Sequence, residues 1–451
     1  MAILPIDSKR YGSNNIRRIF DEIRRLEYQL RVEGAIAQAQ GAHGVIPKSA
    51  ALEIKKKAVI RYVSIKDWRE EESRVRHETA ALVEVLSTSC TKSTKPWIHY
   101  SLTSNDILDT SMSLQIRDAI EIIDRYMVTI LKVLKQKAKK YRSLPSVGRT
   151  HGQHASVMAF GLKFASWLAE FSRHSTRLEE AKRRVLVCKT LGVIGTGSVM
   201  GVNALAVQKS TAKLLGLSPV MGATQIVPRD LYAEVTFLVA LIGSSLDKIA
   251  VEIRNLQRTE IGEVEEPFEK GQIGSSAVPS KRNPAGCERV SSLARLLRAF
   301  PEIELGNIPL WHERDLSNSA NERFVIPMSF ILLDEMLTSM IHILKRLEVN
   351  EKVIQDNINI SGGKIFSEFI LDRLIRKGVA RSKAHALLRE VTWESINQKI
   401  SFNDALRKSK NIKPFLKESE IRAVIDPKKC LGASTQIIDE IVHSVEKTCH
   451  V

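Results

Sequence analysis

One uninterrupted apolar pattern, from Asn105 to Tyr141, constrains this chain more than any other feature. Apolar side chains recur along it at the three- and four-residue spacing of a helix, and no glycine or proline interrupts it before Pro145. At 1.5 Å per residue, such a helix would be roughly 50 Å long. A helix of this length predicts a bundle of long helices.

Further segments with helical spacing precede and follow this one. The early segments are 15–40 and 65–86, and the later ones are 156–186, 229–261, 284–300 and 318–347, with a kink expected at Pro327. No alternating β pattern of any length is evident. Because helices this long can hardly all hide an apolar face inside one compact chain, we expect several subunits to associate.

These patterns predict an all-α protein of three domains. The expected divisions are an N-terminal helical domain (1–100), a central long-helix bundle (101–349) and a C-terminal helical domain (350–451). The last part returns to shorter helices, which Gly362, Gly363, Pro414 and Pro427 separate.

The charge of the chain is strongly positive, with 68 Lys and Arg against 51 Asp and Glu. That balance allows an anionic substrate, a nucleic acid or a lysine-rich surface. Aromatic residues are only 6% and do not interleave with the basic runs, so stacking platforms for nucleic acid are not evident. We therefore expect no nucleic-acid partner, although a non-catalytic helical nucleic-acid binder stays the competing class.

Neither a membrane nor a metal is indicated by the sequence. No stretch approaches the roughly 18 apolar residues of a membrane span, and the N-terminus lacks the apolar core of a signal peptide. The five cysteines form no C-x-x-C pair and have no metal-ligand spacing with histidines. We expect a cytoplasmic location, no metal site and no disulfides.

The segment from Gly271 to Glu288 reads GQIGSSAVPSKRNPAGCE and combines features that are rarely found together. Its glycines permit movement, and Asn283 before Pro284 predicts the start of a helix. The free N–H groups of that helix start, with Lys281 beside them, suit an anion. The structural alternative is that a Gly/Ser-rich segment between helices serves only as a linker.

A serine in such a loop can remove a proton only if donors and positive charge stabilise its alkoxide. The helix start and the neighbouring cations would supply both. Glu288, one turn into the helix, could orient a histidine, or it could simply complement the helix dipole.

Three other polar segments lie beside the expected long helices. Thr103 and Ser104 precede the longest helix, as caps or as a carboxylate seat. His151 and His154 share a glycine-bounded turn and could move protons near pH 7, although a loop histidine is more often structural. The segment 311–323 could hold a phosphate or could be a helix cap with surface charges.

The loop GSSAVPSKRNP, Gly274 to Pro284, resembles the signature loop of the fumarase/aspartase lyase superfamily. The segments HYSLTSND, RTHGQHA and WHERDLSNSANER resemble those of the adenylosuccinate lyase family. This resemblance implies a mostly helical homotetramer whose active sites are each built from three subunits. It also implies β-elimination of fumarate from adenylosuccinate to give AMP, and from the succinylcarboxamide ribotide (SAICAR) to give AICAR in purine nucleotide biosynthesis, without a cofactor.

The resemblance also implies roles for individual residues. Ser275 would be the general base and His151 the general acid, with Glu288 orienting the acid. The remaining implied residues are Lys281 and Asn283 at the carbanion-like intermediate, Thr103 and Ser104 at a carboxylate, His77 near the leaving side, Arg10, Tyr11, Gln225 and Arg289 at the substrate, and Arg314, Ser319 and Arg323 at its phosphate.

The signature loop departs from the family pattern at two positions. Val278 stands where methionine is usual, and Ser280 replaces a common histidine. Neither position carries the chemistry in the family. Argininosuccinate lyase and carboxymuconate cycloisomerase stay as alternatives because they share the signature loop. They do not need a phosphate site, so Arg314, Ser319 and Arg323 are the residues that discriminate.

Overall fold

The computed structural model describes residues 4–449, which fold largely into helices. Contacts divide the chain into two compact units, each assembled from several separate segments. Unit 1 comprises the described residues up to 126 with 174–246 and 292–338, and unit 2 comprises 127–173, 247–291 and the described residues from 339. The three-domain boundaries at 100 and 349 stay a prediction.

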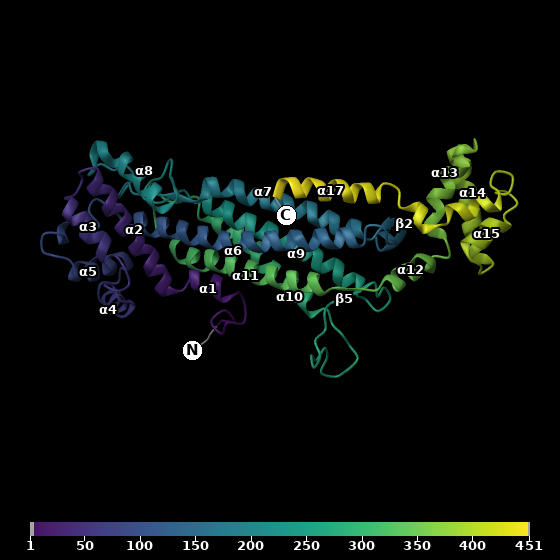
Figure 1. Ribbon diagram of the computed structural model, residues 1–451, viewed down its shortest axis with the longest axis horizontal. Coiled ribbons are helices and arrows are strands. Elements are labelled where there is room, and N and C mark those ends of the chain that lie inside the picture. The colour runs from purple at the N-terminus through teal and green to yellow at the C-terminus, as the bar shows by residue number, and fades with distance from the viewer. Residues whose placement is uncertain (1–3, 450–451) are drawn as a thin grey trace. The chain divides into compact units, whose positions relative to one another are not determined.

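The expected long helices are present, and the all-α fold class is confirmed (Figure 1). They are α6 (Ser104–Lys140), α7 (Gly161–Val185), α9 (Asp230–Leu256), α10 (Ala285–Gly306) and α11 (Ser319–Arg346). The helix α11 continues through Pro327. Each of these helices contributes residues to both units.

Unit 1 also contains the helices of the N-terminal segment and α8 (Figure 1). They are α1 (Asn14–Ile19), α2 (Glu22–Ala42), α3 (Lys48–Lys57), α4 (Ile65–Val75), α5 (Glu78–Ser89) and α8 (Ala204–Leu215), with a 3-10 turn η1 (Lys95–Trp97) and another, η2 (Gly201–Asn203). The helices α3 and α8 pack against α2. A shared apolar core includes the fully buried Leu30, Ile54 and Leu82.

Two segments expected to be single helices are each broken in two. Asp21 caps α2 by accepting a hydrogen bond from the Arg24 N–H, which separates α2 from α1. Arg76 ends α4 in a left-handed conformation (φ 54°), and His77 then caps α5. Both breaks occur at polar residues whose capping geometry interrupts an otherwise continuous apolar spacing.

Unit 2 contains a second helical group near the C-terminus. Its elements are α12 (Glu351–Ile360), η3 (Lys364–Phe366), α13 (Ser367–Arg376), α14 (Arg381–Asn397), α15 (Phe402–Lys408), α16 (Glu418–Val424), η4 (Pro427–Cys430) and α17 (Ser434–Cys449). The helix α17 returns to the end of α6 within this unit. There Arg142 Nε donates to Asp439 Oδ1 at 2.7 Å, and Lys139 Nζ lies 2.9 Å from Glu446 Oε1.

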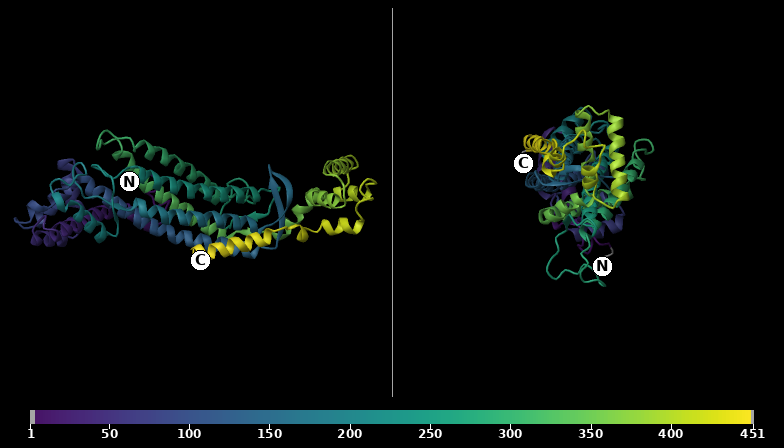
Figure 2. Two further views of the ribbon diagram at one scale, coloured as in Figure 1. Left: turned by 90° about the horizontal axis from the view of Figure 1, so that it is seen from above. Right: turned by 90° about the vertical axis from the view of Figure 1, so that its right-hand side faces the viewer.

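Short strands correct the expectation that no β structure would form. The described strands are β1 (Pro145–Thr150), β2 (Gln153–Ala159), β3 (Val187–Cys188), β4 (Ser218–Pro219), β5 (Val264–Glu265) and β6 (Glu348–Val349). They pair as β1 with β2 and β5 with β6, both antiparallel, and β3 with β4 in parallel. The β1–β2 hairpin can be followed in Figure 2, and its short strands are anchored on other elements of unit 2.

Among the described residues, one helix is long and apolar enough, by composition, to cross a membrane. An 18-residue window of α11 has a mean hydropathy of 1.6, and 72% of that window is buried inside the fold. Within this helix Asp334 is fully buried and accepts hydrogen bonds from the N–H and hydroxyl of Ser13. These features are those of a core helix in a helical bundle.

Candidate active site

The signature loop lies in unit 2 between β5 and α10, and it projects from the helices of that unit (Figures 1 and 2). Asn283 Nδ2 donates to the Gly274 carbonyl oxygen at 2.9 Å, which ties the two ends of the loop together. A Cβ atom at Gly274 would lie 2.2 Å from the carbonyl oxygen of Lys281. Gly274 is therefore required by the close approach of two backbone segments, and only Gly271, with open space around it, fits the expected role in movement.

The hydroxyl of Ser275 is held inside this closed loop. Its Oγ accepts hydrogen bonds from the backbone N–H groups of Ala277 and Val278 at 3.3 and 3.1 Å. Two N–H donors on one oxygen favour a negative charge there and leave the hydroxyl proton free to depart. The structure therefore gives the predicted base the donors that a serine alkoxide needs.

The start of α10 differs from the expectation. The helix begins at Ala285, one residue later than predicted. The N–H groups of Gly286 and Cys287 donate to Glu266 Oε2 and Oε1 at 3.0 and 2.6 Å. The negative charge of Glu266 thus already complements the helix dipole. That this helix start suits a further anion stays a prediction.

A cavity of about 890 Å³ lies beside the loop within unit 2. Its lining includes Lys281, Asn283 and Glu288 together with basic residues of α9 and the segment after it. Lys281 has no ion-pair partner among residues 4–449, whereas Arg282 lies 3.3 Å from Glu265. The structure thus brings the predicted Lys281 and Asn283 to one cavity and leaves the charge of Lys281 available.

Two other predicted residues of α10 lie close to this loop in sequence. Glu288 is exposed at the edge of the cavity, and no contact described for residues 4–449 joins it to a histidine. Arg289 donates from Nη2 to Ser339 Oγ at 3.1 Å, on α11. The contact of Arg289 with the bundle is one that the sequence did not reveal.

His151 lies at the turn of the β1–β2 hairpin. The turn residues His151 and Gly152 both have positive φ, 52° and 74°, as a two-residue hairpin turn requires. The His151 side chain is exposed. This geometry presents the predicted acid at the tip of a hairpin, where the sequence predicted a glycine-bounded turn without strands.

An ion pair anchors the hairpin two residues before its turn. Arg149 donates from Nη2 to Oε1 of the fully buried Glu263 at 2.6 Å, and Asn357 Nδ2 donates to the same oxygen at 2.9 Å. Opposite Arg149 in the register lies His154, whose pKa is lowered by burial and by the charge of Arg149. His154 is therefore held neutral beside a cation, which disfavours a role as a charged acid.

His77, in unit 1, has a defined protonation pattern. As the N-cap of α5, its Nδ1 accepts a hydrogen bond from the Ala80 N–H at 3.1 Å. That nitrogen consequently carries no proton, so the ring proton of the neutral imidazole is on Nε2. Nε2 lies 3.4 Å from Ser104 Oγ, so the structure brings together two residues that the sequence placed in separate segments.

Thr103 begins the turn that leads into α6, and its N–H donates to Asp106 Oδ2 at 2.8 Å. Asp106 is fully buried and pairs with the equally buried Lys189, Nζ to Oδ1 at 2.5 Å. The backbone of Thr103 is therefore committed to an internal cap, and only its side chain is left to bind a carboxylate. Nothing in the sequence around Lys189 indicated this pair.

The predicted phosphate residues share one cleft in unit 1. Arg314, Ser319 and Arg323 all line it, with Asn105 and Asn318. Arg314 donates from Nη1 to Gln225 Oε1 at 2.9 Å, and its buried Nε has no hydrogen-bond partner among the described residues. Burial lowers the pKa of the Arg314 guanidinium. An unpaired buried donor at a cleft favours binding of an anion.

Arg323 is paired across unit 1 to Glu78. Its Nη2 lies 3.3 Å from Glu78 Oε2, and the same oxygen lies 2.6 Å from Arg25 Nη2. Gln29 donates to the other oxygen of Glu78. Glu78 thus holds two arginines beside His77, and this arrangement was missed because a first-turn glutamate is normally exposed.

A buried network supports the floor of the same cleft and was also missed. Arg229 Nη1 lies 2.9 Å from Asp109 Oδ2, and its Nε lies 2.7 Å from Glu322 Oε1. Asp109 also accepts a hydrogen bond from the Val227 N–H at 2.8 Å. The network joins α6 and α11 to the residue just before α9. It thereby holds these elements together beside the cleft that Arg314 and Ser319 line. Partners so far apart in sequence give no local signal.

Arg10 and Tyr11 lie in the N-terminal segment before α1. Arg17 Nη1 donates to the Tyr11 carbonyl oxygen at 3.0 Å, and the Arg10 N–H donates to the Pro5 carbonyl oxygen at 2.9 Å. These contacts involve the backbone of both residues. Their side chains are not joined to the other predicted residues by any contact described for residues 4–449.

Within residues 4–449, no group of three or more His, Cys, Asp or Glu side chains is placed to hold a metal ion. The five cysteines are free, and four of them are buried.

Comparison with known proteins identifies relatives over nearly the whole chain. Residues 8–297 match a family model described as lyase, and residues 363–441 match one described as the adenylosuccinate lyase C-terminus. The chain is 40% identical to the adenylosuccinate lyases of Methanocaldococcus jannaschii, over 99% of this chain and 96% of that protein, and of Pyrococcus abyssi, over 99% of each. It is 35% identical to that of Thermotoga maritima, over 97% of this chain and 99% of that protein.

Solved structures with the same fold are named for several different activities. A fumarate lyase from Mesorhizobium sp. BNC1 matches with a TM-score of 0.87 at 30% identity, over 96% of this chain and 98% of that one. A 3-carboxy-cis,cis-muconate lactonizing enzyme from Pseudomonas putida matches with a TM-score of 0.90 at 26% identity, over 99% of this chain and 100% of that one. The backbone fold therefore does not discriminate between these activities.

Proposed function

This chain belongs to the adenylosuccinate lyase family of the fumarase/aspartase superfamily, and we propose that it releases fumarate from adenylosuccinate to give AMP. We extend the proposal to SAICAR, which would give AICAR in purine nucleotide biosynthesis. Argininosuccinate lyase and carboxymuconate cycloisomerase are not favoured, because the relatives at 35–40% identity are adenylosuccinate lyases.

The geometry of Ser275 is the observation that carries the proposal. In a β-elimination the base removes the proton from Cβ of the succinyl group. The Oγ that accepts two N–H hydrogen bonds supports this role for Ser275, because those donors stabilise the alkoxide.

Neighbouring groups stabilise the negative charge of the intermediate and carry out the second proton transfer. Lys281 and Asn283 stabilise the carbanion-like intermediate through the succinyl carboxylates, supported by the unpaired charge of Lys281 at the loop cavity. His151 protonates the departing nitrogen, supported by its exposed place at the hairpin turn. Glu288 orients a histidine that another subunit supplies.

The nucleotide phosphate binds to Arg314, Ser319 and Arg323, which share one cleft. On binding, the phosphate replaces part of the contact of Arg323 with Glu78. The Nε2–H of His77, close to Ser104, donates on the leaving side of the substrate, and Thr103 and Ser104 hold a carboxylate. Gln225, Arg289, Arg10 and Tyr11 complete the proposed set of substrate contacts.

The assembly proposed is a homotetramer with active sites shared between subunits. Apolar side chains exposed on the long helices support it. They include Phe237 (48% exposed) and Leu241 (44%) on α9 and Leu296 (49%) on α10. Such exposure on adjacent helical turns favours burial against another subunit. We also propose a cytoplasmic location, on the basis of the proposed reaction.

The test is turnover by the purified protein with three candidate substrates. Adenylosuccinate should lose the absorbance of its succinyladenine group as fumarate forms, whereas argininosuccinate and carboxymuconate should not react. Turnover of either alternative without turnover of adenylosuccinate would overturn the proposed substrate.

A further inference from the structure

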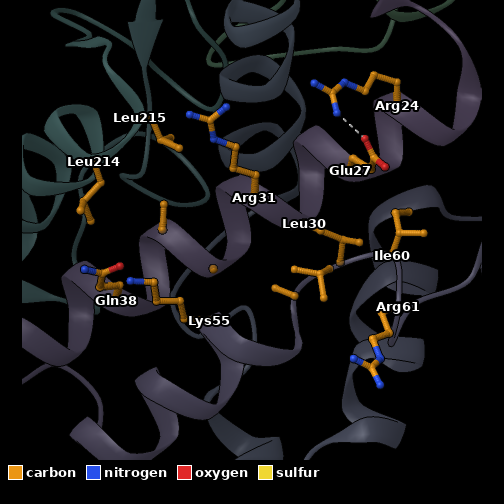
Figure 3. Close-up of a pocket in the computed structure, with 14 residues that line it drawn as sticks. Arg24, Glu27, Leu30, Arg31, Gln38, Lys55, Ile60, Arg61, Leu214 and Leu215 are labelled. Carbon is orange, nitrogen blue, oxygen red and sulfur yellow. Dashed lines mark hydrogen bonds and ion pairs between the residues drawn. The ribbon is translucent and has the colours of Figure 1, made fainter. Parts of the chain in front are cut away.

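A second cavity, of about 700 Å³, lies in unit 1, and its lining includes none of the residues placed in the candidate active site (Figure 3). Its volume is in the range of pockets that hold small organic ligands. One face of α2 lines it at helical spacing, through Arg24, Glu27, Arg31 and Gln38. The rest of the lining comes from α3, the turn after α3 and the end of α8.

The charges at this cavity are unbalanced. Arg24, Arg31, Lys55 and Arg61 reach it from three segments, and Glu27 is the one carboxylate in its lining. Glu27 is already engaged, since its Oε2 lies 2.6 Å from Arg24 Nη1. No hydrogen bond or ion pair described for residues 4–449 engages the side chains of Arg31, Lys55 or Arg61.

The floor of the cavity is apolar and is fixed by close helix packing. Gly34 on α2 faces Ala58, and a Cβ at Gly34 would lie 3.4 Å from the Cβ of Ala58. Small residues there leave a hollow between α2 and the end of α3. Val59, Ile60 and Leu214 provide the larger apolar surfaces, and Val59 and Leu214 are each 44% exposed.

The cavity could also be a set of solvated surface charges, an apolar pocket or a site for an inorganic anion, but each of these explanations accounts for only part of the observations. Exposed lysines and arginines are usually solvated, but here three segments bring them around one hollow with an apolar floor. A purely apolar ligand would leave the cations unpaired, and a simple inorganic anion would leave the apolar floor exposed.

We propose that this cavity binds an organic polyanion of nucleotide size. Its phosphates contact Arg31, Lys55 and Arg61, and its apolar body covers Val59, Ile60 and Leu214.

The test measures binding of ATP to the full-length protein by calorimetry, with adenosine and inorganic triphosphate as comparison probes. Lys55→Glu should weaken ATP binding about tenfold or more, because it replaces a charged hydrogen bond with repulsion. Lys56→Glu is the matched control, since Lys56 is exposed in the same helical turn but does not line the cavity. Arg314→Ala reports on binding at the candidate active site instead. Arg61→Ala, with its smaller charge change, replaces Lys55→Glu if that variant does not fold.

The proposal is supported if ATP binds more tightly than either comparison probe and if Lys55→Glu weakens it while Lys56→Glu and Arg314→Ala do not. Equal effects of Lys55→Glu and Lys56→Glu would overturn it. So would inorganic triphosphate binding as tightly as ATP, or loss of binding in Arg314→Ala alone. A lower assembly mass of Lys55→Glu in sedimentation would assign the cavity to another copy of the chain and would likewise overturn the proposal.

Discussion

Replacing Gly274 with alanine tests whether the closed loop positions Ser275. The new Cβ would lie 2.2 Å from the Lys281 carbonyl oxygen, whereas Cβ contacts below 3.0 Å are essentially never seen. One side of the loop must therefore move by about 1 Å. A misplacement of about 1 Å can cost about a hundredfold in rate. We expect kcat of Gly274→Ala for adenylosuccinate to fall about a hundredfold.

The folded state should be little affected, because most of this loop is exposed and its residues contribute little to a core. Thermal unfolding measured beside the kinetics should give a Tm close to that of the unmodified protein. Gly271→Ala is the matched control, since a Cβ there meets nothing within 4 Å and only adds strain at a φ of +89°. Unchanged kcat in Gly274→Ala would refute the positioning argument.

Three further predictions concern other parts of the protein. Arg314→Ala should raise KM for adenylosuccinate about tenfold or more with little change in kcat, because a charged hydrogen bond to phosphate is lost; an unchanged KM removes the phosphate role. Burial and the Glu322 charge raise the pKa of the Glu304 carboxyl to about 7, so its folded form loses stability as pH rises from about 4.5 to 7. Glu304→Gln should therefore be more stable than the unmodified protein above pH 7, by up to about 3 kcal/mol in denaturant unfolding, and equally stable near pH 4; a difference independent of pH contradicts this. Mixing inactive His151→Ala and Ser275→Ala subunits should restore part of the activity if sites are shared, and properly mixed tetramers that stay inactive argue against sharing.

The long helices could be predicted from the sequence because their signal is local. Apolar spacing over many turns predicted α6 to within one residue at each end. The breaks at Asp21 and at Arg76 were missed because each is made by a polar cap within a continuous apolar pattern. The second break matters for the site, since it makes His77 a cap and sets which of its nitrogens carries the proton.

The sequence gives a weaker signal for the hairpin that carries His151 than for the long helices. Its strands are short, and the register shifts between Gly148 and Arg149, which disturbs the alternation expected of a strand. The positive φ of His151 also gives no sequence pattern, because only a few per cent of non-glycine residues adopt it, even though histidine does so more often than most. The sequence predicted a glycine-bounded turn at this residue, whereas only the structure showed the two paired strands that make it a hairpin.

Buried ion pairs could not be predicted because their partners are distant in the chain. Lys189 with Asp106, and Arg229 with Asp109 and Glu322, look like ordinary surface charges in the sequence. Burial of a charge is stable only with a partner, and the partner is set by the packing of long helices. The contact of Glu266 with the start of α10 could not be predicted for the same reason, because Glu266 precedes that helix start by about twenty residues.

The most direct test of the account compares Ser275→Ala with Ser276→Ala in the release of fumarate from adenylosuccinate. The two serines are adjacent, but Ser275 is the one whose Oγ accepts the N–H groups of Ala277 and Val278. Loss of a general base predicts a fall in kcat of about 10² to 10⁴ for Ser275→Ala, with Ser276→Ala remaining active. Full activity of Ser275→Ala, with loss in Ser276→Ala, would contradict the account.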